Sequence, residues 1–153
     1  MRVVVTGGRD FDDRAMLWAG LDRLYELSPI TELIEGGARG ADRFAAEWVA
    51  WINQSAGQEI IKHTTVLAEW STHGKAAGYL RNVRMADMRP DLVFATPGGK
   101  GTTMMISVAH DRGIRVIYLE KMGVPRSTEP PDEADYTQAG STPPNLVSSG
   151  AAE

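Results

Sequence analysis

The chain has 153 residues, no cysteine and a net charge of −4 at pH 7, which fits one domain with a core of its own. The missing cysteines exclude a disulfide framework and a thiolate metal site. The absence of a basic surplus disfavours duplex nucleic acid as a partner. The apolar run at residues 2–6 is too short for a signal peptide, and no later run approaches the length of a membrane span. We therefore expect a cytoplasmic protein with no membrane partner.

The first half of the chain alternates apolar runs with amphipathic stretches. Residues 2–6 are a continuous apolar run, typical of a strand buried on both faces. A helix is predicted over about residues 12–26, and the Ser-Pro pair that follows ends it. A second strand at 31–35 and a second helix at 41–54 complete this half.

The second half repeats the same alternation. A run rich in β-branched residues predicts a strand over residues 58–66. After a loop, a helix is predicted over about residues 75–88, followed by a strand at 91–95. A helix at 101–112 and a strand at 114–119 come last.

Strands separated by helices predict right-handed crossovers and an α/β fold, a three-layer sandwich with a five-stranded, mainly parallel sheet. We assume the usual strand order 3-2-1-4-5, in which strand one lies between strands two and four. This domain takes residues 1–120. Residues 121–153 are rich in Pro, Ser, Thr and Gly and carry five acids against two bases, which predicts a flexible acidic tail.

Three glycine-rich loops follow strands one, two and four directly: VTGGRDF at 5–11, IEGGARGAD at 34–42 and PGGKGTT at 97–103. With the assumed order they meet at the carboxyl edge of the sheet, where such folds bind ligands. Glycine lets backbone N–H groups approach an anion closely, and a helix N-terminus adds unpaired donors. The loops therefore predict one site for an anionic ligand. None fits the P-loop pattern, because Lys100 is followed by glycine.

The segments VTGGRDF, EGGARGAD, GYLRNVRM and PGGKGT together resemble the SLOG superfamily, in its YspA/YpsA-related branch, over about residues 1–119. The resemblance implies a Rossmann-like fold that binds a nucleotide or nucleotide-derived ligand at the glycine loops. It also implies an oligomer, and we expect a homo-oligomer.

The same superfamily includes the Lonely-guy phosphoribohydrolases, which cleave the N-glycosidic bond of nucleoside monophosphates. The chain is similar to them at Arg81, at Met85 and over residues 97–102. Their motif continues with acidic residues where this chain has Met104 and Met105. This departure argues against hydrolysis, because a thioether cannot stabilise an oxocarbenium-like centre or position water.

The residues expected to bind the ligand combine the loop glycines with nearby donors and cations. They are Gly7, Gly8, Arg9, Gly36, Gly37, Arg39, Arg81, Pro97, Gly98, Gly99, Lys100, Gly101, Thr102 and Thr103. Arg81 is the main expected phosphate contact, because a guanidinium binds phosphate in a bidentate manner. Glu35 and Asp42 are the candidates for a catalytic base or a ribose contact, although Asp42 can equally cap its helix.

Several other side chains keep two interpretations. Trp70 and Tyr79 can stack on a base or fill a core or interface. Trp48, Trp51, Met104 and Met105 can form a contact between subunits or pack internally. The three histidines show no metal-ligand spacing, and of these only His73 is a candidate for the site; we expect no metal and no organic cofactor.

The first functional hypothesis is the binding, for sensing or sequestering, of a nucleotide or nucleotide-derived phosphate ligand. The alternative is an N-glycosidic-bond hydrolase of the nucleoside monophosphate phosphoribohydrolase type, so the sequence leaves open whether the protein is an enzyme. Nucleic-acid processing is a third hypothesis, which the charge balance disfavours.

Overall fold

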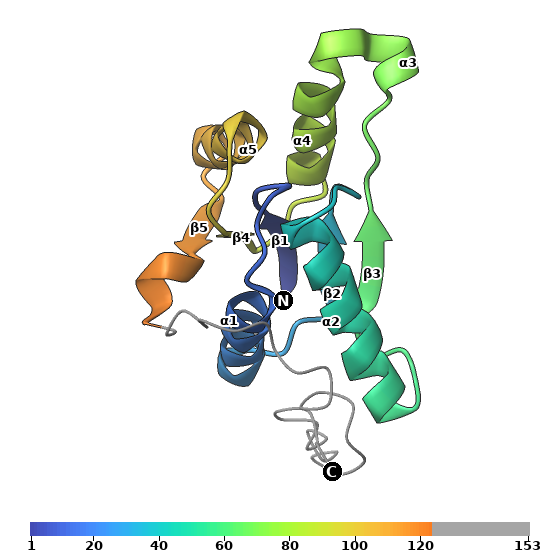
Figure 1. The fold of residues 1–153 in the computed structure, drawn as a ribbon, viewed down its shortest axis with the longest axis vertical. Helices are drawn as coiled ribbons and strands as arrows, with labels where there is room; N and C mark the ends of the chain where they lie inside the picture. The colour runs from blue at the N-terminus through green and yellow to red at the C-terminus, as the bar shows by residue number, and fades with distance from the viewer. Residues whose placement is uncertain (124–153) are drawn as a thin grey trace.

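The computed structural model describes residues 1–123, so the predicted tail at 121–153 lies almost wholly outside the described residues. Strands alternate with helices as predicted (Figure 1). The strands are β1 (Arg2–Thr6), β2 (Glu32–Glu35), β3 (Lys62–Thr65), β4 (Leu92–Ala95) and β5 (Arg115–Tyr118). The helices are α1 (Arg14–Leu27), α2 (Ala41–Ala56), α3 (Trp70–His73), α4 (Ala77–Asp87) and α5 (Lys100–Asp111), with short 3₁₀ helices η1 (Gly74–Ala76) and η2 (Leu119–Met122).

The sheet is parallel throughout, in the order β3-β2-β1-β4-β5. The assumed strand order and the Rossmann-like α/β fold are therefore confirmed. From β1 the chain builds β2 and β3 on one side and then β4 and β5 on the other. The switch point lies beside β1, and the loops after β1, β2 and β4 are neighbours there.

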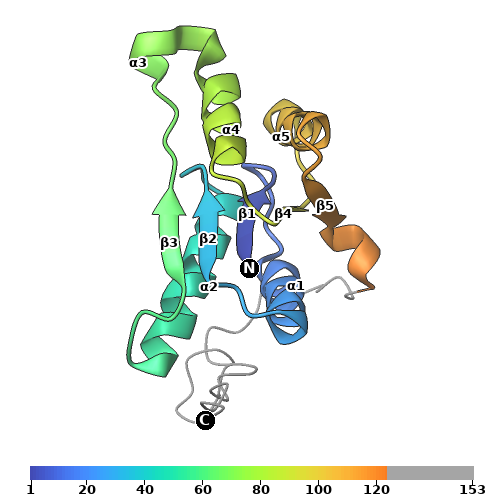
Figure 2. The ribbon, with the colours of Figure 1, turned by 180° about the vertical axis from the view of Figure 1, so that it is seen from behind.

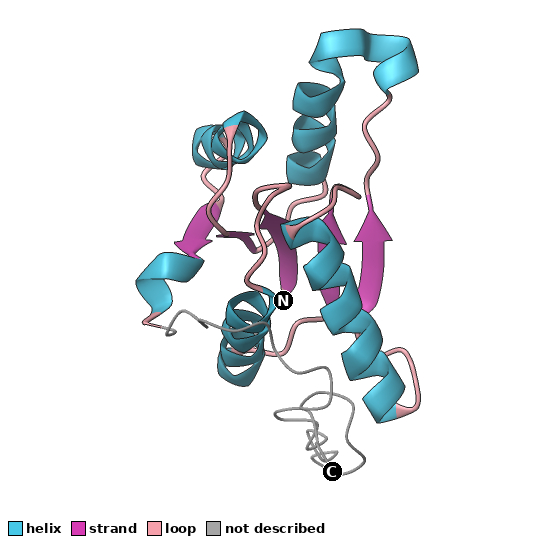
Figure 3. Cartoon of the chain, viewed as in Figure 1, coloured by secondary structure: helices cyan, strands magenta, loops and turns pink. Residues whose placement is uncertain are grey.

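Strand register divides the buried residues between two cores. Val3 pairs with Leu33 and Leu92, and all three belong to the core under α1 and α2. One residue further on, Val4 pairs with Ile34, and both belong to the core under α4 and α5. Successive strand residues point to opposite faces, so both faces of the sheet carry apolar side chains. Helices cover both faces for this reason (Figure 3).

β3 is shorter than predicted, because a side chain holds the preceding residues in another conformation. Asn53 Oδ1 accepts the backbone N–H groups of Ile60 and Ile61, each at 2.9 Å, and Asn53 Nδ2 donates to Ile61 O at 2.8 Å. Ile61 is fully buried in the core under α2. Pairing with β2 consequently begins at Lys62.

The segment around Trp70 and His73, predicted as a loop, contains helix α3. The chain continues past the carboxyl end of β3, forms α3 and η1, and returns along α4, so that this segment projects beyond the sheet (Figures 1 and 2). His73 pairs with Glu69 at 3.2 Å across one helical turn. We call this projection, residues 66–79, the arm.

Four side chains were considered for a contact between subunits, and two of them are core residues. Trp48 and Met105 are fully buried, one in each core. Trp51 packs against the first core, and Met104 lines a pocket described below. Internal packing is therefore the role that the structure gives Trp48 and Met105.

Candidate functional site

The three glycine-rich loops touch one another at the carboxyl edge of the sheet. Gly8 donates its N–H to Pro97 O at 2.9 Å, which joins the β1 and β4 loops. Gly8 O accepts the N–H of Ala41, the first residue of α2, at 3.3 Å. The loops thus form one continuous backbone surface.

The glycines of this surface fall into two groups, according to what a side chain would meet. A Cβ at Gly7 would lie 1.9 Å from Thr96 Oγ1, and one at Gly98 would clash as well. A Cβ at Gly99 or Gly101 would meet no atom of the described residues within 4 Å. The first group lets the loops approach each other, whereas the second leaves open space at the start of α5.

A pocket of about 900 Å³ opens over this surface, with α4 and part of the arm as its other wall. Its charged lining residues are the cations Arg9, Lys75, Arg81 and Lys100 and the acids Asp10, Asp12, Asp13 and Asp42. The opposite charges are equal in number, so selectivity for an anion must come from directed donors more than from net charge.

The N-termini of α1, α2 and α5, which follow the three glycine-rich loops, reach the pocket, and they differ in how their positive ends are neutralised. Asp13 caps α1 and accepts the N–H of Met16 at 3.0 Å. α2 carries Asp42 in its first turn. Among the described residues, no side chain caps α5, whose N-cap is Gly99, and its first turn holds no acid. The partial positive charge and first-turn N–H groups of α5 therefore face the pocket without a carboxylate.

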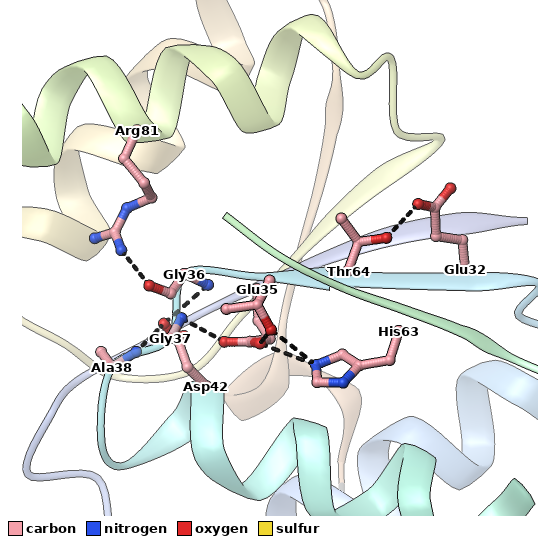
Figure 4. A network of polar contacts seen from close by, with 10 residues as sticks. Glu32, Glu35, Gly36, Gly37, Ala38, Asp42, His63, Thr64 and Arg81 are labelled. Atoms are coloured by element: carbon pink, nitrogen blue, oxygen red, sulfur yellow. Dashed lines mark hydrogen bonds and ion pairs between the residues drawn. The ribbon is translucent and has the colours of Figure 1, made fainter. Parts of the chain in front are cut away.

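Glu35 and its partners fix the start of the β2 loop (Figure 4). The Glu35 carboxylate, 2% exposed, accepts the Gly37 N–H and the Thr65 hydroxyl and lies 2.9 Å from His63 Nε2. Of the residues that the structure describes, Glu35 is not among those that line the pocket. This candidate base is thus engaged in holding the loop.

Asp42, the other candidate base, does line the pocket. Its Oδ2 accepts the N–H groups of Gly36 at 3.1 Å and Ala38 at 3.2 Å, so it also braces the β2 loop (Figure 4). Burial raises the pKa of Asp42 to about 6, and the nearby Glu35 carboxylate acts in the same direction. Asp42 is consequently a pocket acid that titrates nearer to neutral pH than an ordinary aspartate.

Arg81 and Asn82 on α4 connect two of the loops. Arg81 donates to Gly36 O at 2.7 Å and to Asn82 Oδ1 at 3.1 Å, while Asn82 Nδ2 donates to Gly101 O at 3.2 Å. Burial lowers the pKa of Arg81, which the neighbouring Asp42 opposes. Arg81 thus supports the β2 loop in addition to lining the pocket.

Most of the residues predicted from the sequence come together in the pocket. Its lining includes Gly7, Gly8, Arg9, Arg81, Pro97, Gly98, Gly99, Lys100, Gly101 and Thr102. Within residues 1–123, the lining does not include the predicted Gly36, Gly37, Arg39 and Thr103.

Each of these four residues has another contact. The Arg81 guanidinium covers Gly36, and Gly37 packs under Leu67. Arg39 pairs with Asp10 at 3.2 Å on the surface, and the Thr103 hydroxyl donates to Gly99 O.

Sequence reasoning missed Asn82, which is 3% exposed and links α4 to α5. The sequence does contain a signal for this role, because Asn82 is a polar residue on the same face of α4 as the core residues Met85 and Ala86. Trp70 and Tyr79 do line the pocket, whereas His73 is outside its lining within the described residues. The same residues hold no group of three or more side chains suited to a metal ion.

The fold and this pocket define a Rossmann-like protein with its cavity at the switch point of the sheet. A family model described as "YspA, cpYpsA-related SLOG family" matches residues 1–73. The chain is also similar to the "Gene 61 protein" of Mycobacterium phage D29, with 38% identity over 119 residues that cover 76% of this chain and 94% of the phage protein. The chain belongs to this YspA-related SLOG family.

Membership supports, in general terms, a nucleotide-related binding or phosphoribohydrolase-like role. No solved structure shows a significant match to the chain. Within the described residues, no helix combines the length and the apolar character that crossing a bilayer requires.

Proposed function

We propose that this protein binds a nucleotide-type ligand whose phosphate group docks at the N-terminus of α5. One observation carries the proposal: α1 and α2 begin with a carboxylate in place, whereas α5 begins with Gly99 and no acid in its first turn. A helix N-terminus in this state favours an anion, because its N–H groups lack acceptors and its dipole is positive.

The surroundings of α5 suit a phosphate in size and charge. Space is open where side chains of Gly99 and Gly101 would lie. Lys100 is exposed and lines the same pocket, and Arg81 adds a half-buried guanidinium. A pocket of about 900 Å³ is large enough for a complete nucleotide. A protein that only binds such a ligand acts by sensing or sequestering it.

Asp42 supports a second candidate, cleavage of the N-glycosidic bond of a nucleoside monophosphate. Its carboxyl lies in the pocket with a pKa raised to about 6, a value suited to proton transfer near neutral pH. Against this role, the carboxylate oxygen already accepts two backbone N–H groups of the β2 loop. Binding without rapid turnover is therefore the better-supported function.

Calorimetry with nucleoside 5′-monophosphates and the matching nucleosides tests the phosphate site. A charge-assisted hydrogen bond contributes about 1.5–3 kcal/mol, so each nucleoside should bind at least about tenfold more weakly than its monophosphate. Lys100→Ala should weaken binding of the monophosphates. Arg115→Ala removes the same charge from the start of β5, at the opposite edge of the sheet, and should leave binding unchanged. Equal affinity for nucleosides and monophosphates would contradict the proposal.

Chromatography of the same mixtures separates the two functions. A binder leaves the monophosphate intact, whereas a hydrolase releases free base in excess of the protein. If base is released and Asp42→Asn stops the release, the second candidate replaces the first.

A further inference from the structure

Two aromatic side chains stand exposed in the wall of the pocket, at the arm. Trp70 is 52% exposed and Tyr79 is 49% exposed, and both line the pocket. They are two of four large apolar side chains that the described residues expose; the others, Leu27 and Leu67, are outside the pocket lining. Exposed aromatic rings inside a polar cavity present flat faces to whatever occupies it.

We infer that Trp70 and Tyr79 hold the planar heteroaromatic base of the ligand, an inference that rests on the proposed function. The position of Trp70, on α3 and against the first turn of α4, supports this role. A Cβ at Gly78 would lie 3.4 Å from Trp70 Cη2, so the indole lies against the one position of this helical turn that has no side chain. Gly78 lines the pocket beside Tyr79, which brings both rings to the same wall.

The spacing along α4 fits a nucleotide with its phosphate at α5. Asn82 contacts Gly101 O at 3.2 Å and so marks the level of the proposed phosphate site. Gly78 lies one helical turn before Asn82, about 6 Å along the axis. A pentose spans a distance of this order between a 5′-phosphate and a base. The rings therefore stand where the base of a phosphate-docked nucleotide would reach.

Stacking explains why the base, and not the sugar or the phosphate, is the group that these residues recognise. Every nucleobase offers a π-face, and base–aromatic stacking tolerates changes in sequence or base type. Lys75, four residues before Tyr79, also lines the pocket and adds a cation that can contact base acceptors or a second phosphate. The ligand class is then a nucleotide with an unobstructed base, read mainly by its flat face.

Titration with adenosine 5′-monophosphate, adenosine and ribose 5-phosphate tests this assignment. Trp70→Ala should weaken binding of the monophosphate roughly ten- to a hundredfold, which is the range for loss of one stacked base. The same substitution should leave the affinity for ribose 5-phosphate unchanged. Trp70→Phe should restore most of the lost affinity, and Tyr79→Ala should act like Trp70→Ala. Leu27→Ala, an exposed apolar control at the end of α1 and outside the lining, should change the affinity for neither ligand.

The outcomes distinguish this inference from the proposed phosphate site. If Trp70→Ala weakens binding of the monophosphate and of ribose 5-phosphate equally, or weakens binding of neither, the stacking role is wrong while the phosphate site stands. If adenosine binds as tightly as its monophosphate and both depend on Trp70, the phosphate site is wrong while stacking stands. Absence of binding by all three probes at millimolar concentration would overturn both. A change in molecular mass by light scattering for Trp70→Ala would assign the ring to a subunit contact and overturn the inference.

Discussion

Replacement of Gly99 should separate helix capping from ligand binding, because this residue is the N-cap of α5. Its φ is −95°, and a Cβ there would meet no atom of the described residues within 4 Å, so alanine, asparagine and aspartate all fit. Asparagine and aspartate are better N-cap residues than glycine by a few tenths of a kcal/mol. We therefore expect Gly99→Asn and Gly99→Asp to keep or slightly raise the melting temperature.

The same two substitutions should weaken ligand binding. Either side chain would accept the first-turn N–H groups that the proposed phosphate requires, and aspartate also adds a negative charge. At an effective dielectric constant of about 20, two unit charges about 5 Å apart repel by roughly 3 kcal/mol, which corresponds to a loss of about a hundredfold in affinity. Gly99→Asn should show an intermediate loss and Gly99→Ala little change.

Calorimetry with the tightest-binding nucleoside monophosphate and thermal melting of each variant provide the two measurements. Affinity should fall in the order alanine, asparagine, aspartate, while the melting temperature does not fall. Wild-type affinity in a folded Gly99→Asp protein would refute the phosphate site at α5. Equal losses for alanine and aspartate would show that shape, and not charge or capping, controls binding.

Three further predictions concern single side chains. Asn82→Ala should lower the free energy of unfolding by about 1–3 kcal/mol, measured in urea, because it removes a buried amide whose hydrogen bonds to Arg81 and Gly101 join α4 to α5. Met105→Glu should unfold the protein or lower its melting temperature sharply, because it buries an unpaired charge in the core, whereas Met104→Glu, on the pocket wall, should stay folded and lose anion affinity. Burial raises the pKa of Asp22 from 3.8 to about 6, so the folded state binds its proton more tightly than the unfolded chain and this group should make the protein more stable as the pH falls from about 7 to 4. Asp22→Asn keeps an acceptor oxygen and should raise the free energy of unfolding at pH 7, by less than about 3 kcal/mol because the group is partly exposed. Because Asp42 titrates in both proteins, comparing the variant with the wild type at each pH cancels its similar effect. A difference in unfolding free energy between the two proteins that stays constant across the pH range would contradict the prediction.

Two central strands could be predicted because each is a short run of mostly apolar residues that both faces of a sheet bury. β1 and β4 show this directly, since all four residues of β4 and the last four of β1 are buried. The start of β3 could not be predicted, because it depends on the Asn53 side chain, which reaches the backbone of Ile60 and Ile61 from the preceding helix. α3 is a single turn, too short for an apolar period to reveal.

The candidate site could be located from the glycine loops, but the separate roles of its residues could not. Gly7 and Gly99 look alike in the sequence, yet one is packed against Thr96 and the other faces open space. Arg81 carries a charge suited to phosphate, and only the packing of α4 shows that it also holds Gly36. Such distinctions depend on tertiary neighbours, which a local pattern does not contain.

The geometry of α5 bears on whether hydrolysis belongs to this chain. Consecutive helical residues point about 100° apart, and accordingly Met104 lines the pocket while Met105 lies fully in the core. An acid at the second of these positions would be buried among apolar side chains, so at most the first can place a carboxylate near a ligand. The remaining pocket acid beside the β2 loop, Asp42, is already engaged by two backbone donors. The proposed phosphate site at the N-terminus of α5 thus needs no acid at either methionine, and this is why we propose binding in preference to hydrolysis.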